Sequence, residues 1–400
     1  MTETPHPDVA VRAWAQRCKP VATELVPLEH AAGRVLAAPI CADRDSPAHD
    51  VSAMDGYAVR FADFDDAGQM PVAGEVTTGA APPDLPQGRA LRIFTGGCVP
   101  PQAELVIRRE DLAETSELIQ LKVPADSLSP GQHIRRRGEN AKANAEIVPP
   151  GIAITPAVIG AAASFGVTSP AVYRQVRLGL LITGDELLAP DDQPAPWQIR
   201  DSNGPVIASM LQGVPWIDVV AVERGNDDPQ QLTRQLAGLL ERCDAIVTTG
   251  GVSMGDHDYI PAVVQAAGGE VVFHKLPIRP GKPMLGATGP DGQAILGLPG
   301  NPVSAMATLR RFGITALRQL AGFSCSTPLA VQVECSEPVS STLGLWWYRL
   351  AKITPTGSAE CVSTRGSGDL ASAAQSDGLI EVPPGTMDAT RVAFYPWALG

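Results

Sequence analysis

The strongest constraint on the fold is a regular alternation of buried-strand and helix patterns over residues 175–322. Short apolar runs typical of central strands are separated by stretches whose apolar residues recur with a helical period. The expected strands are residues 177–182, 217–222, 245–249, 270–273 and 294–298, and the expected helices are residues 203–211, 229–240, 259–267 and 302–320. This spacing is that of successive βαβ units, so the sequence predicts a doubly wound parallel sheet.

The rest of the chain has a different pattern. In residues 46–137, short apolar runs alternate with Gly and Pro clusters, which indicates a β-rich domain. Residues 323–400 return to strand-like runs and predict a small barrel or sandwich. Short helices are expected at residues 9–15, 29–35 and 156–165, the last capped by Thr155. A chain of 400 residues is too long for one core, so several domains are expected.

Charge and cysteine content exclude several classes of protein. The formal net charge of −12 repels a phosphate backbone, so we expect no nucleic-acid partner. The seven cysteines form no Cys-x-x-Cys pair, which favours reduced thiols over disulfides or a zinc ribbon. No signal peptide is visible in residues 1–19, and the longest apolar stretch, residues 151–167, is interrupted by polar residues. We therefore expect a cytoplasmic protein with no membrane partner.

Glycine-containing polar motifs follow three of the expected strands. They are TGDE (183–186), TTGGVSMGDHD (248–258) and PGNP (299–302). Glycines let the backbone approach an anion closely, and the N-termini of the following helices supply free N–H groups. A single motif of this kind is usually only a turn. Because the carboxyl ends of parallel strands meet at one edge of the sheet, three of them together favour an anion-binding site.

A cluster of cations lies in the segment KLPIRPGKP (275–283), which contains Lys275, Arg279 and Lys282. Such a segment is commonly a solvated loop. The chain has few cations overall, however, so their clustering near the glycine-rich edge favours the binding of phosphate or another oxyanion. The segment is not a P-loop, because Leu276 and Pro283 stand where that motif requires Gly and Ser or Thr.

Carboxylates are expected at the same edge of the sheet. They are Asp185, Glu186, Asp227, Asp256 and Asp258. Acids beside a phosphate site suggest Mg²⁺ that bridges carboxylate and phosphate oxygens. We expect Asp185 and Asp256 to be ordinary surface acids, and Asp228 to be the N-cap of the helix that follows it.

The segment GVSMG (251–255) also fits a serine hydrolase, in which Ser253 would be the nucleophile. That interpretation needs a histidine on a later strand end. The only later histidines, His257 and His274, follow closely behind Ser253 in sequence, which leaves little room for the hydrolase fold. The hydrolase therefore stays as an alternative.

Two motifs in the β-rich domain look like turns when taken alone. They are SAMDGYAVR (52–60) and FTGG (94–97), and their residues by themselves do not make Asp55 catalytic. The run of arginines at 135–137 fits either an exposed basic turn or a phosphate clamp, and both readings stay open.

Taken together, these motifs resemble the molybdopterin molybdenumtransferase family, which includes the E-domain of gephyrin. The resemblance covers nearly the whole chain. The matching segments are SAMDGYAVR, FTGG…P (94–100), RRRGE (135–139), TGDEL (183–187), TTGGVSMGDHDY (248–259), KLPIRPGKP, GLPGNPVSA (297–305) and GDL…DGLIEVP (368–383).

The resemblance implies four domains and an elongated homodimer. The implied domains are a discontinuous domain I (1–45 plus 138–174), an inserted β-rich domain II (46–137), a doubly wound molybdopterin-binding domain III (175–322) and a C-terminal β-barrel domain IV (323–400). The active cleft would lie between domain III of one subunit and domain II of its partner.

The resemblance also implies roles for individual residues. The expected catalytic residues are Asp55 and Thr95 from the partner, with Glu186, Asp258 and Lys275. The expected Mg²⁺ ligands are Glu186, Asp227 and Asp258. The expected substrate-binding residues are Gly250, Gly251, Ser253, Arg135, Arg279, Lys282, Pro299, Gly300, Asn301 and Ser304.

The chain departs from the family pattern at two positions. Asn140 stands where the family usually has Asp after RRRGE, which removes a negative charge and puts a metal or proton role there in doubt. Arg279 stands where the family usually has Lys. Arginine keeps the charge and adds a planar fork of donors, so oxyanion binding should survive this change.

The activity implied by the resemblance is Mg²⁺-dependent insertion of molybdate into adenylylated molybdopterin, with release of AMP. The implied partners are the upstream adenylyltransferase and the acceptor molybdoenzymes, both in transient contact. An adenylyltransferase that shares domain III is a second candidate, but 400 residues exceed the size of that domain. A non-catalytic scaffold of the gephyrin type is a third, and it would need an added partner-binding region that we do not see in the sequence.

Overall fold

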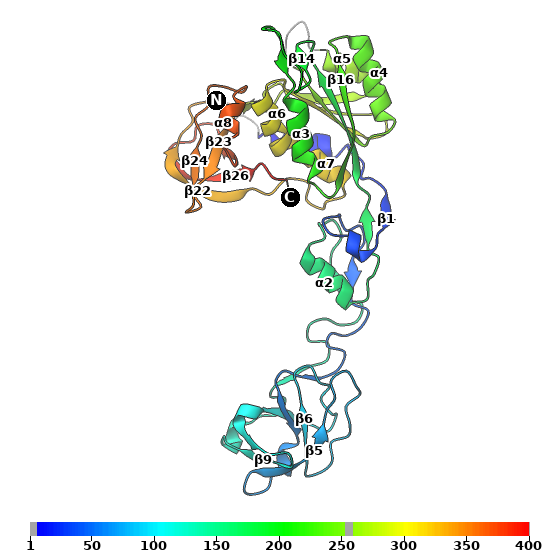
Figure 1. Ribbon diagram of the computed structural model, residues 1–400, viewed down its shortest axis with the longest axis vertical. Helices are drawn as coiled ribbons and strands as arrows, with labels where there is room; N and C mark the ends of the chain where they lie inside the picture. The colour runs from blue at the N-terminus through cyan, green and yellow to red at the C-terminus, as the bar shows by residue number, and fades with distance from the viewer. Residues whose placement is uncertain (1–5, 253–258, 400) are drawn as a thin grey trace. The chain divides into compact units, whose positions relative to one another are not determined.

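The computed structural model describes residues 6–252 and 259–399. The chain divides into two compact units (Figure 1). The first unit comprises Met1–Ala38, Pro150–Gly160 and Thr168–Gly400, and the second comprises Pro39–Pro149 and Ala161–Val167. Each unit has its own sheets and its own core.

A six-stranded sheet forms the centre of the first unit, in the order β16-β13-β17-β21-β20-β18. The bounds are β13 (Val176–Thr183), β16 (Ile217–Gly225), β17 (Ala245–Thr249), β18 (Glu270–His274), β20 (Leu285–Thr288) and β21 (Ala294–Leu298). The first four strands in this order are parallel, whereas β20 is antiparallel to both its neighbours. The predicted doubly wound domain is confirmed, and β20 is a strand that the sequence pattern did not predict.

Helices cover both faces of this sheet. One face packs against α1 (Asp8–Ala15), α3 (Asn203–Gln212), α6 (Pro302–Thr308), the π-helix η5 (Leu309–Gly313) and α7 (Ile314–Leu320), and the other packs against α4 (Pro229–Leu240) and α5 (Ile260–Ala266). Successive residues of β13 serve opposite faces, since Leu180 packs with the first group and Leu181 with the second. Burial on both faces explains why the strands appear in the sequence as continuous apolar runs.

Most predicted helices are present, but their ends and one whole helix differ from expectation. Asp228 caps α4 as predicted, because its side chain accepts hydrogen bonds from the backbone N–H groups of Gln230 and Gln231. The expected helix at 29–35 is wrong. Only the 3₁₀ turn η1 (Leu28–His30) forms there, and Gly33 then turns the chain with a φ of 74°.

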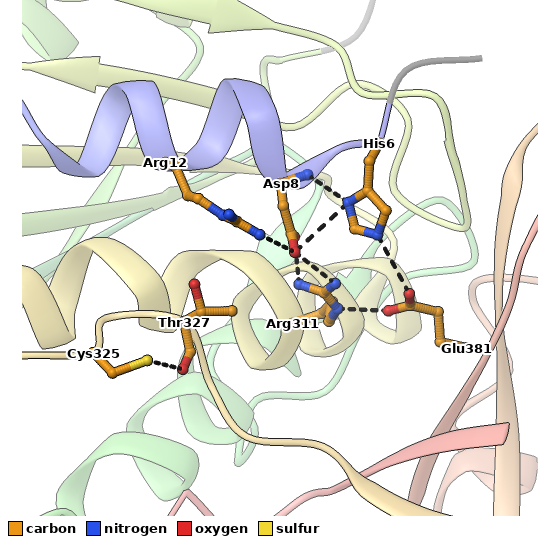
Figure 2. A network of polar contacts seen from close by, with 7 residues as sticks. All are labelled: His6, Asp8, Arg12, Arg311, Cys325, Thr327 and Glu381. Atoms are coloured by element: carbon orange, nitrogen blue, oxygen red, sulfur yellow. Dashed lines mark hydrogen bonds and ion pairs between the residues drawn. The ribbon is translucent and has the colours of Figure 1, made fainter. Parts of the chain in front are cut away.

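A buried ion network joins three elements of the first unit (Figure 2). Arg311 of η5 is 3% exposed and donates to both Asp8 carboxylate oxygens, at 2.7 and 3.2 Å. Its Nε donates to the Glu381 carboxylate at 2.7 Å. A charge this deeply buried persists only when it is paired, so the network fixes α1 and β25 (Gly378–Val382) against η5.

The C-terminal part of the first unit is a closed five-stranded barrel. Its strands are β22 (Val331–Val339), β23 (Trp346–Ile353), β24 (Ala359–Cys361), β25 and β26 (Ala389–Pro396). They pair in the order β23-β24-β22-β26-β25, and β25 pairs with β23 to close the ring. The short strand β19 (Ile278–Arg279) extends this barrel by pairing with β23, and α8 (Leu370–Ala373) lies between β24 and β25 in sequence.

The second unit is β-rich, as predicted. Its six-stranded sheet has the order β7-β4-β6-β5-β9-β8. The bounds are β4 (Gly56–Val59), β5 (Gln69–Glu75), β6 (Ala90–Ile93), β7 (Leu105–Arg108), β8 (Leu112–Glu114) and β9 (Leu118–Leu121). Strands β4, β5 and β6 adjoin the candidate site residues of this unit.

Short elements complete the chain. They are the pairs β1 (Thr23–Leu25) with β12 (Ala171–Tyr173), β2 (Ile40–Cys41) with β11 (Glu146–Val148), β3 (Val51–Ser52) with β10 (Ile134–Arg135) and β14 (Leu187–Leu188) with β15 (Ile199–Arg200), the helix α2 (Pro156–Ser164), and the 3₁₀ turns η2 (Phe61–Asp63), η3 (Arg109–Asp111) and η4 (Ala125–Ser127). The Thr155 hydroxyl accepts a hydrogen bond from Val158 N–H, as expected for a cap of α2. None of the helices within 6–252 and 259–399 has the length and apolarity needed to cross a bilayer.

Candidate functional site

The carboxyl ends of the four parallel strands meet at one edge of the central sheet. Thr183 of β13 is in register with Gly225 of β16, and Thr249 of β17 is in register with Leu298 of β21. Ile182 of β13 pairs with Thr249. The polar turns that follow these strands are therefore neighbours, which is the arrangement in which open α/β sheets bind ligands.

The two glycine-rich turns at this edge are in direct contact. The backbone N–H of Gly250 donates to the Leu298 carbonyl at 3.1 Å, which ties the turn after β17 to the turn after β21. Gly250 has a φ of 87°, and a Cβ there would lie 2.8 Å from the Thr183 carbonyl oxygen. A side chain at this position would need both a strained backbone and displaced neighbours, so the close approach of these turns depends on glycine.

The third turn motif is held by a residue that sequence reasoning missed. Asn203, the first residue of α3, donates from its side-chain nitrogen to the Gly300 carbonyl at 2.7 Å. Its side-chain oxygen is buried and has no hydrogen-bond partner. Pro299 and Ser304 are buried, whereas Gly300 and Asn301 are exposed at the edge. Of the four predicted substrate-binding residues in this segment, Gly300 and Asn301 are therefore the ones that a ligand can reach.

Carboxylates follow the neighbouring strands β13 and β16, as the sequence indicated. Asp185 accepts a hydrogen bond from the Asp227 backbone N–H at 3.1 Å, so it links the turn after β13 to the turn after β16. Glu186 lies beside Asp185 in the first of these turns. Among residues 6–252 and 259–399, no three His, Cys, Asp or Glu side chains gather as a metal site. The predicted ligand Asp258 and the predicted substrate contact Ser253 lie outside the described residues.

The basic loop is anchored to both the sheet domain and the barrel. The Lys275 and Leu276 N–H groups donate to the carbonyls of Met284 and Lys282, both at 2.9 Å. Beyond this turn, β19 pairs with β23 of the barrel, and the Trp346 N–H donates to the Pro277 carbonyl at 2.9 Å. Arg279 and Lys282 are exposed on this stiff support.

The barrel also contributes a turn to which the sequence analysis assigned no role. The Val303 N–H at the start of α6 donates to the Ser367 carbonyl at 3.0 Å, so the turn before α8 lies against the PGNP turn. Asp369 caps α8 and is held with its pKa at about 2 by hydrogen bonds from the Arg365 and Ser372 backbone N–H groups and the Ser372 hydroxyl. The Gly- and Ser-rich segment 364–369, followed by a capped helix, was the available signal.

In the second unit, the motifs that contain Asp55 and Thr95 converge. Gly56 of β4 and Ile93 of β6 are cross-strand partners, which places Asp55 near Thr95. One carboxylate oxygen of Asp55 accepts hydrogen bonds from the Thr95 N–H and hydroxyl, both at 2.8 Å. These bonds lower the pKa of Asp55, and the charges of Arg109 and Arg92 act in the same direction.

A cavity of about 650 Å³ opens on the six-stranded sheet of this unit. Its lining includes Tyr57, Arg92, Arg109 and Glu114. The Tyr57 hydroxyl donates to Glu114 at 2.8 Å, and Arg109 pairs with the same carboxylate. Two of the lining residues, Arg92 and Arg109, are the cations whose charges act on Asp55.

Arg135 is occupied within its own turn. Its guanidinium donates to the Glu139 carboxylate at 2.5 Å and to the Asn140 side-chain oxygen at 2.8 Å. The Asn140 that departs from the family pattern therefore still accepts a hydrogen bond from Arg135, but without a negative charge.

The hydrolase alternative gains no support from the described residues. Its Ser253 and His257 lie outside them. The other candidate base, His274, places its Nε2 at 2.7 Å from the Val252 carbonyl oxygen. A nitrogen that faces a carbonyl must carry the hydrogen, so this nitrogen cannot accept a proton from a serine.

Comparisons with known proteins agree across nearly the whole chain. The family model described as the MoeA N-terminal region (domain I and II) matches residues 6–166, and the model of a probable molybdopterin binding domain matches residues 179–319. The molybdopterin molybdenumtransferase of Synechococcus elongatus is 33% identical over 92% of this chain and 92% of its own length. That of Haemophilus influenzae is 34% identical over 76% of this chain and 74% of its own length.

Solved structures agree with these relatives. The molybdopterin biosynthesis moeA protein from Pyrococcus horikoshii OT3 superposes with a TM-score of 0.81 at 25% identity, covering 99% of this chain and all of that one. The glycine-rich sheet edge and the two β-rich parts agree with these relatives. The chain therefore belongs to the molybdopterin molybdenumtransferase family and is a transferase of molybdenum cofactor biosynthesis.

Proposed function

We propose that this transferase inserts molybdate into adenylylated molybdopterin and releases AMP, in a reaction that depends on Mg²⁺. The observation that carries the proposal is the meeting of the strand-end turns at one sheet edge, with Gly250 bonded to Leu298. Such turns present backbone N–H groups to anions, and the substrate carries phosphates. The two dithiolene thiols bond to molybdenum while one molybdate oxygen leaves as water with the two thiol protons, and a second water molecule hydrolyses the phosphoanhydride to release AMP.

The nucleotide phosphates bind at the glycine-rich turns. Gly250 and Gly251, together with the PGNP turn, allow the ligand to approach the backbone closely. Ser253 completes this set. The cations of the basic loop, Lys275, Arg279 and Lys282, neutralise molybdate and the departing AMP.

The available donors suit Mg²⁺. Carboxylate oxygens are the ligands that this ion prefers, and it often binds through one or two of them together with substrate phosphates. The Asp185–Asp227 hydrogen bond draws the turns of Glu186 and Asp227 together, so these two carboxylates, with Asp258, would hold the ion. When bound, Mg²⁺ would offset negative charge on the phosphate oxygens.

We further propose that the working molecule is a homodimer in the cytoplasm. Asp55 and Thr95 of one subunit then complete the site at the sheet edge of its partner. The support is the resemblance to the family and the occurrence of candidate residues in both units. We also propose the four-domain division at residues 45/46, 137/138, 174/175 and 322/323, and transient contacts with the upstream adenylyltransferase and acceptor molybdoenzymes.

The decisive experiment measures AMP release from adenylylated molybdopterin, with and without molybdate and Mg²⁺. Wild-type protein should release AMP and form molybdenum-loaded pterin only when both are present. Glu186→Gln should reduce the rate at least about tenfold if its carboxylate helps hold the ion. Asp218→Asn is the matched control, because this exposed carboxylate begins β16 at the opposite end of the sheet.

Other outcomes would point to the alternatives. Consumption of ATP with unadenylylated pterin would identify an adenylyltransferase. If the Glu186→Gln variant releases AMP at the wild-type rate, Glu186 is not a residue of the site. Absence of any pterin-dependent turnover by folded wild-type protein would contradict the proposal and favour a scaffold.

A further inference from the structure

The basic loop and the barrel share one aromatic side chain. Arg279 of β19 is in register with Trp347 of β23, and its guanidinium carbon lies 5.9 Å from the centre of the Trp347 ring. Arg349 lies two residues further along β23, with its guanidinium carbon 4.6 Å from the same ring. Two cations from different segments therefore contact a single indole.

In the part of the chain that the structure describes, neither of these cations is neutralised by an acid. Within 6–252 and 259–399, no carboxylate forms an ion pair with Arg279 or Arg349. An aromatic face attracts a guanidinium without accepting its in-plane hydrogen bonds. The N–H donors of such a cation stay available for an oxyanion, which would not be so if a carboxylate held it.

The indole itself has a firm support. Trp347 is half-buried and packs against the core of the barrel. The loop that carries Arg279 is fixed to the same strand through the Trp346 N–H and the Pro277 carbonyl. The ring therefore offers Arg279 a fixed surface, and an exposed arginine held this way loses less side-chain freedom when it binds a ligand.

The identity of residue 279 fits this arrangement. This chain has Arg at a position where the resemblance implies Lys. A planar guanidinium can lie along an aromatic face and still direct a fork of donors outward, which an ammonium group cannot do.

We propose that Trp347 is a positioning residue for oxyanion binding, because its indole orients Arg279, with Arg349 beside it, so that guanidinium donors face the ligand. The inference rests on the proposed role of Arg279 in binding molybdate. It adds a residue from the barrel that does not itself touch the substrate.

The test measures the binding of molybdate alone to the full chain by isothermal titration calorimetry. Trp347→Leu should weaken binding about two- to fivefold, the range expected for a partly exposed cation–π contact. Trp347→Phe keeps a ring and should retain most of the affinity. Trp197→Leu is the control, because Trp197 is 79% exposed and belongs to neither the basic loop nor the barrel.

A double-mutant cycle separates positioning from a general effect on the fold. If Trp347 acts through Arg279, Trp347→Leu should lower the affinity for molybdate less in an Arg279→Ala background than in the wild-type protein. Equal losses in both backgrounds, or equal affinity in all the variants, would overturn the proposal. If Trp347→Leu lowers the thermal midpoint, Trp347→Met, which keeps an apolar side chain without a ring, replaces it in the cycle.

The binding assay distinguishes this inference from the proposed function. Wild-type protein that binds molybdate with the expected Trp347 dependence, yet releases no AMP, would support the positioning role and contradict the reaction. If the Trp347→Leu variant releases AMP with normal molybdate dependence, that result would support the reaction and contradict the positioning role.

Discussion

At the scale of single residues, the charge of Asp55 is set by two donors from Thr95. The Thr95 N–H and hydroxyl bond the same carboxylate oxygen and hold the pKa of Asp55 below its ordinary value of 3.8. A carboxyl whose pKa is lowered by folding stabilises the protein above its unfolded pKa. That contribution is lost as the pH falls through the lower folded pKa. The acid form of Asp55 is therefore disfavoured throughout the physiological range.

Removing the hydroxyl should raise this pKa. Thr95→Val retains the backbone donor and loses the side-chain donor, so the pKa of Asp55 should move back toward its ordinary value. Titration of the Asp55 carboxyl carbon by NMR measures the shift. Thr95→Ser keeps the hydroxyl and should leave the pKa low. An unchanged pKa in Thr95→Val would mean that the backbone N–H alone sets it.

At the scale of elements, the π-helix η5 owes its place to Arg311. Replacing Arg311 by Met should destabilise the protein by about 3–5 kcal/mol, because Asp8 and Glu381 would be left buried without their cation. The free energy of unfolding in urea measures this loss. Arg12→Ala is the matched control. Arg12 is 60% exposed on its side chain and lies 3.6 Å from the same Asp8, so its loss should cost less than about 1 kcal/mol.

Double replacement tests the cause of this loss. If the unpaired carboxylates are responsible, changing Asp8 and Glu381 to Asn and Gln in the Arg311→Met protein should recover part of the stability. A triple variant as unstable as Arg311→Met would instead assign the loss to the packing of the arginine side chain.

The elements that sequence reasoning predicted well are those whose pattern is local. The strands and helices of residues 175–322 follow from apolar periodicity, and the Asp228 cap follows from its place before Pro229. The strand β20 was missed because four residues of small and mixed character carry no period. The false helix at 29–35 had a suitable apolar spacing, but Gly33 takes a left-handed conformation there.

The candidate site likewise contains residues that could be predicted from the sequence and residues that could not. The strand-end turns could be placed together from the sequence because parallel strands end at one edge. Asn203 and Trp347 could not, since their importance comes from contacts with Gly300 and Arg279, which are remote in the chain. The pairing of Asp55 with Thr95 likewise depends on the register of β4 and β6, which no local pattern encodes.

At the scale of the whole molecule, the proposed homodimer can be tested by complementation. If Asp55 acts on the sheet edge of the partner subunit, Asp55→Asn and Glu186→Ala are defects in the two halves of one shared site. Each variant alone should be nearly inactive. In a heterodimer, one site would carry both substitutions and the other would carry neither.

Subunits of the two variants should therefore regain activity when they are mixed, unfolded and refolded together. With random pairing, half of the dimers are mixed and half of their sites are intact, so AMP release should reach about a quarter of the wild-type rate. If Asp55 instead served the sheet edge of its own chain, each subunit would keep one defect in its only site, and mixing would restore nothing. Size-exclusion chromatography with light scattering gives the mass of the refolded species, and a monomer with full wild-type activity would rule out the shared site.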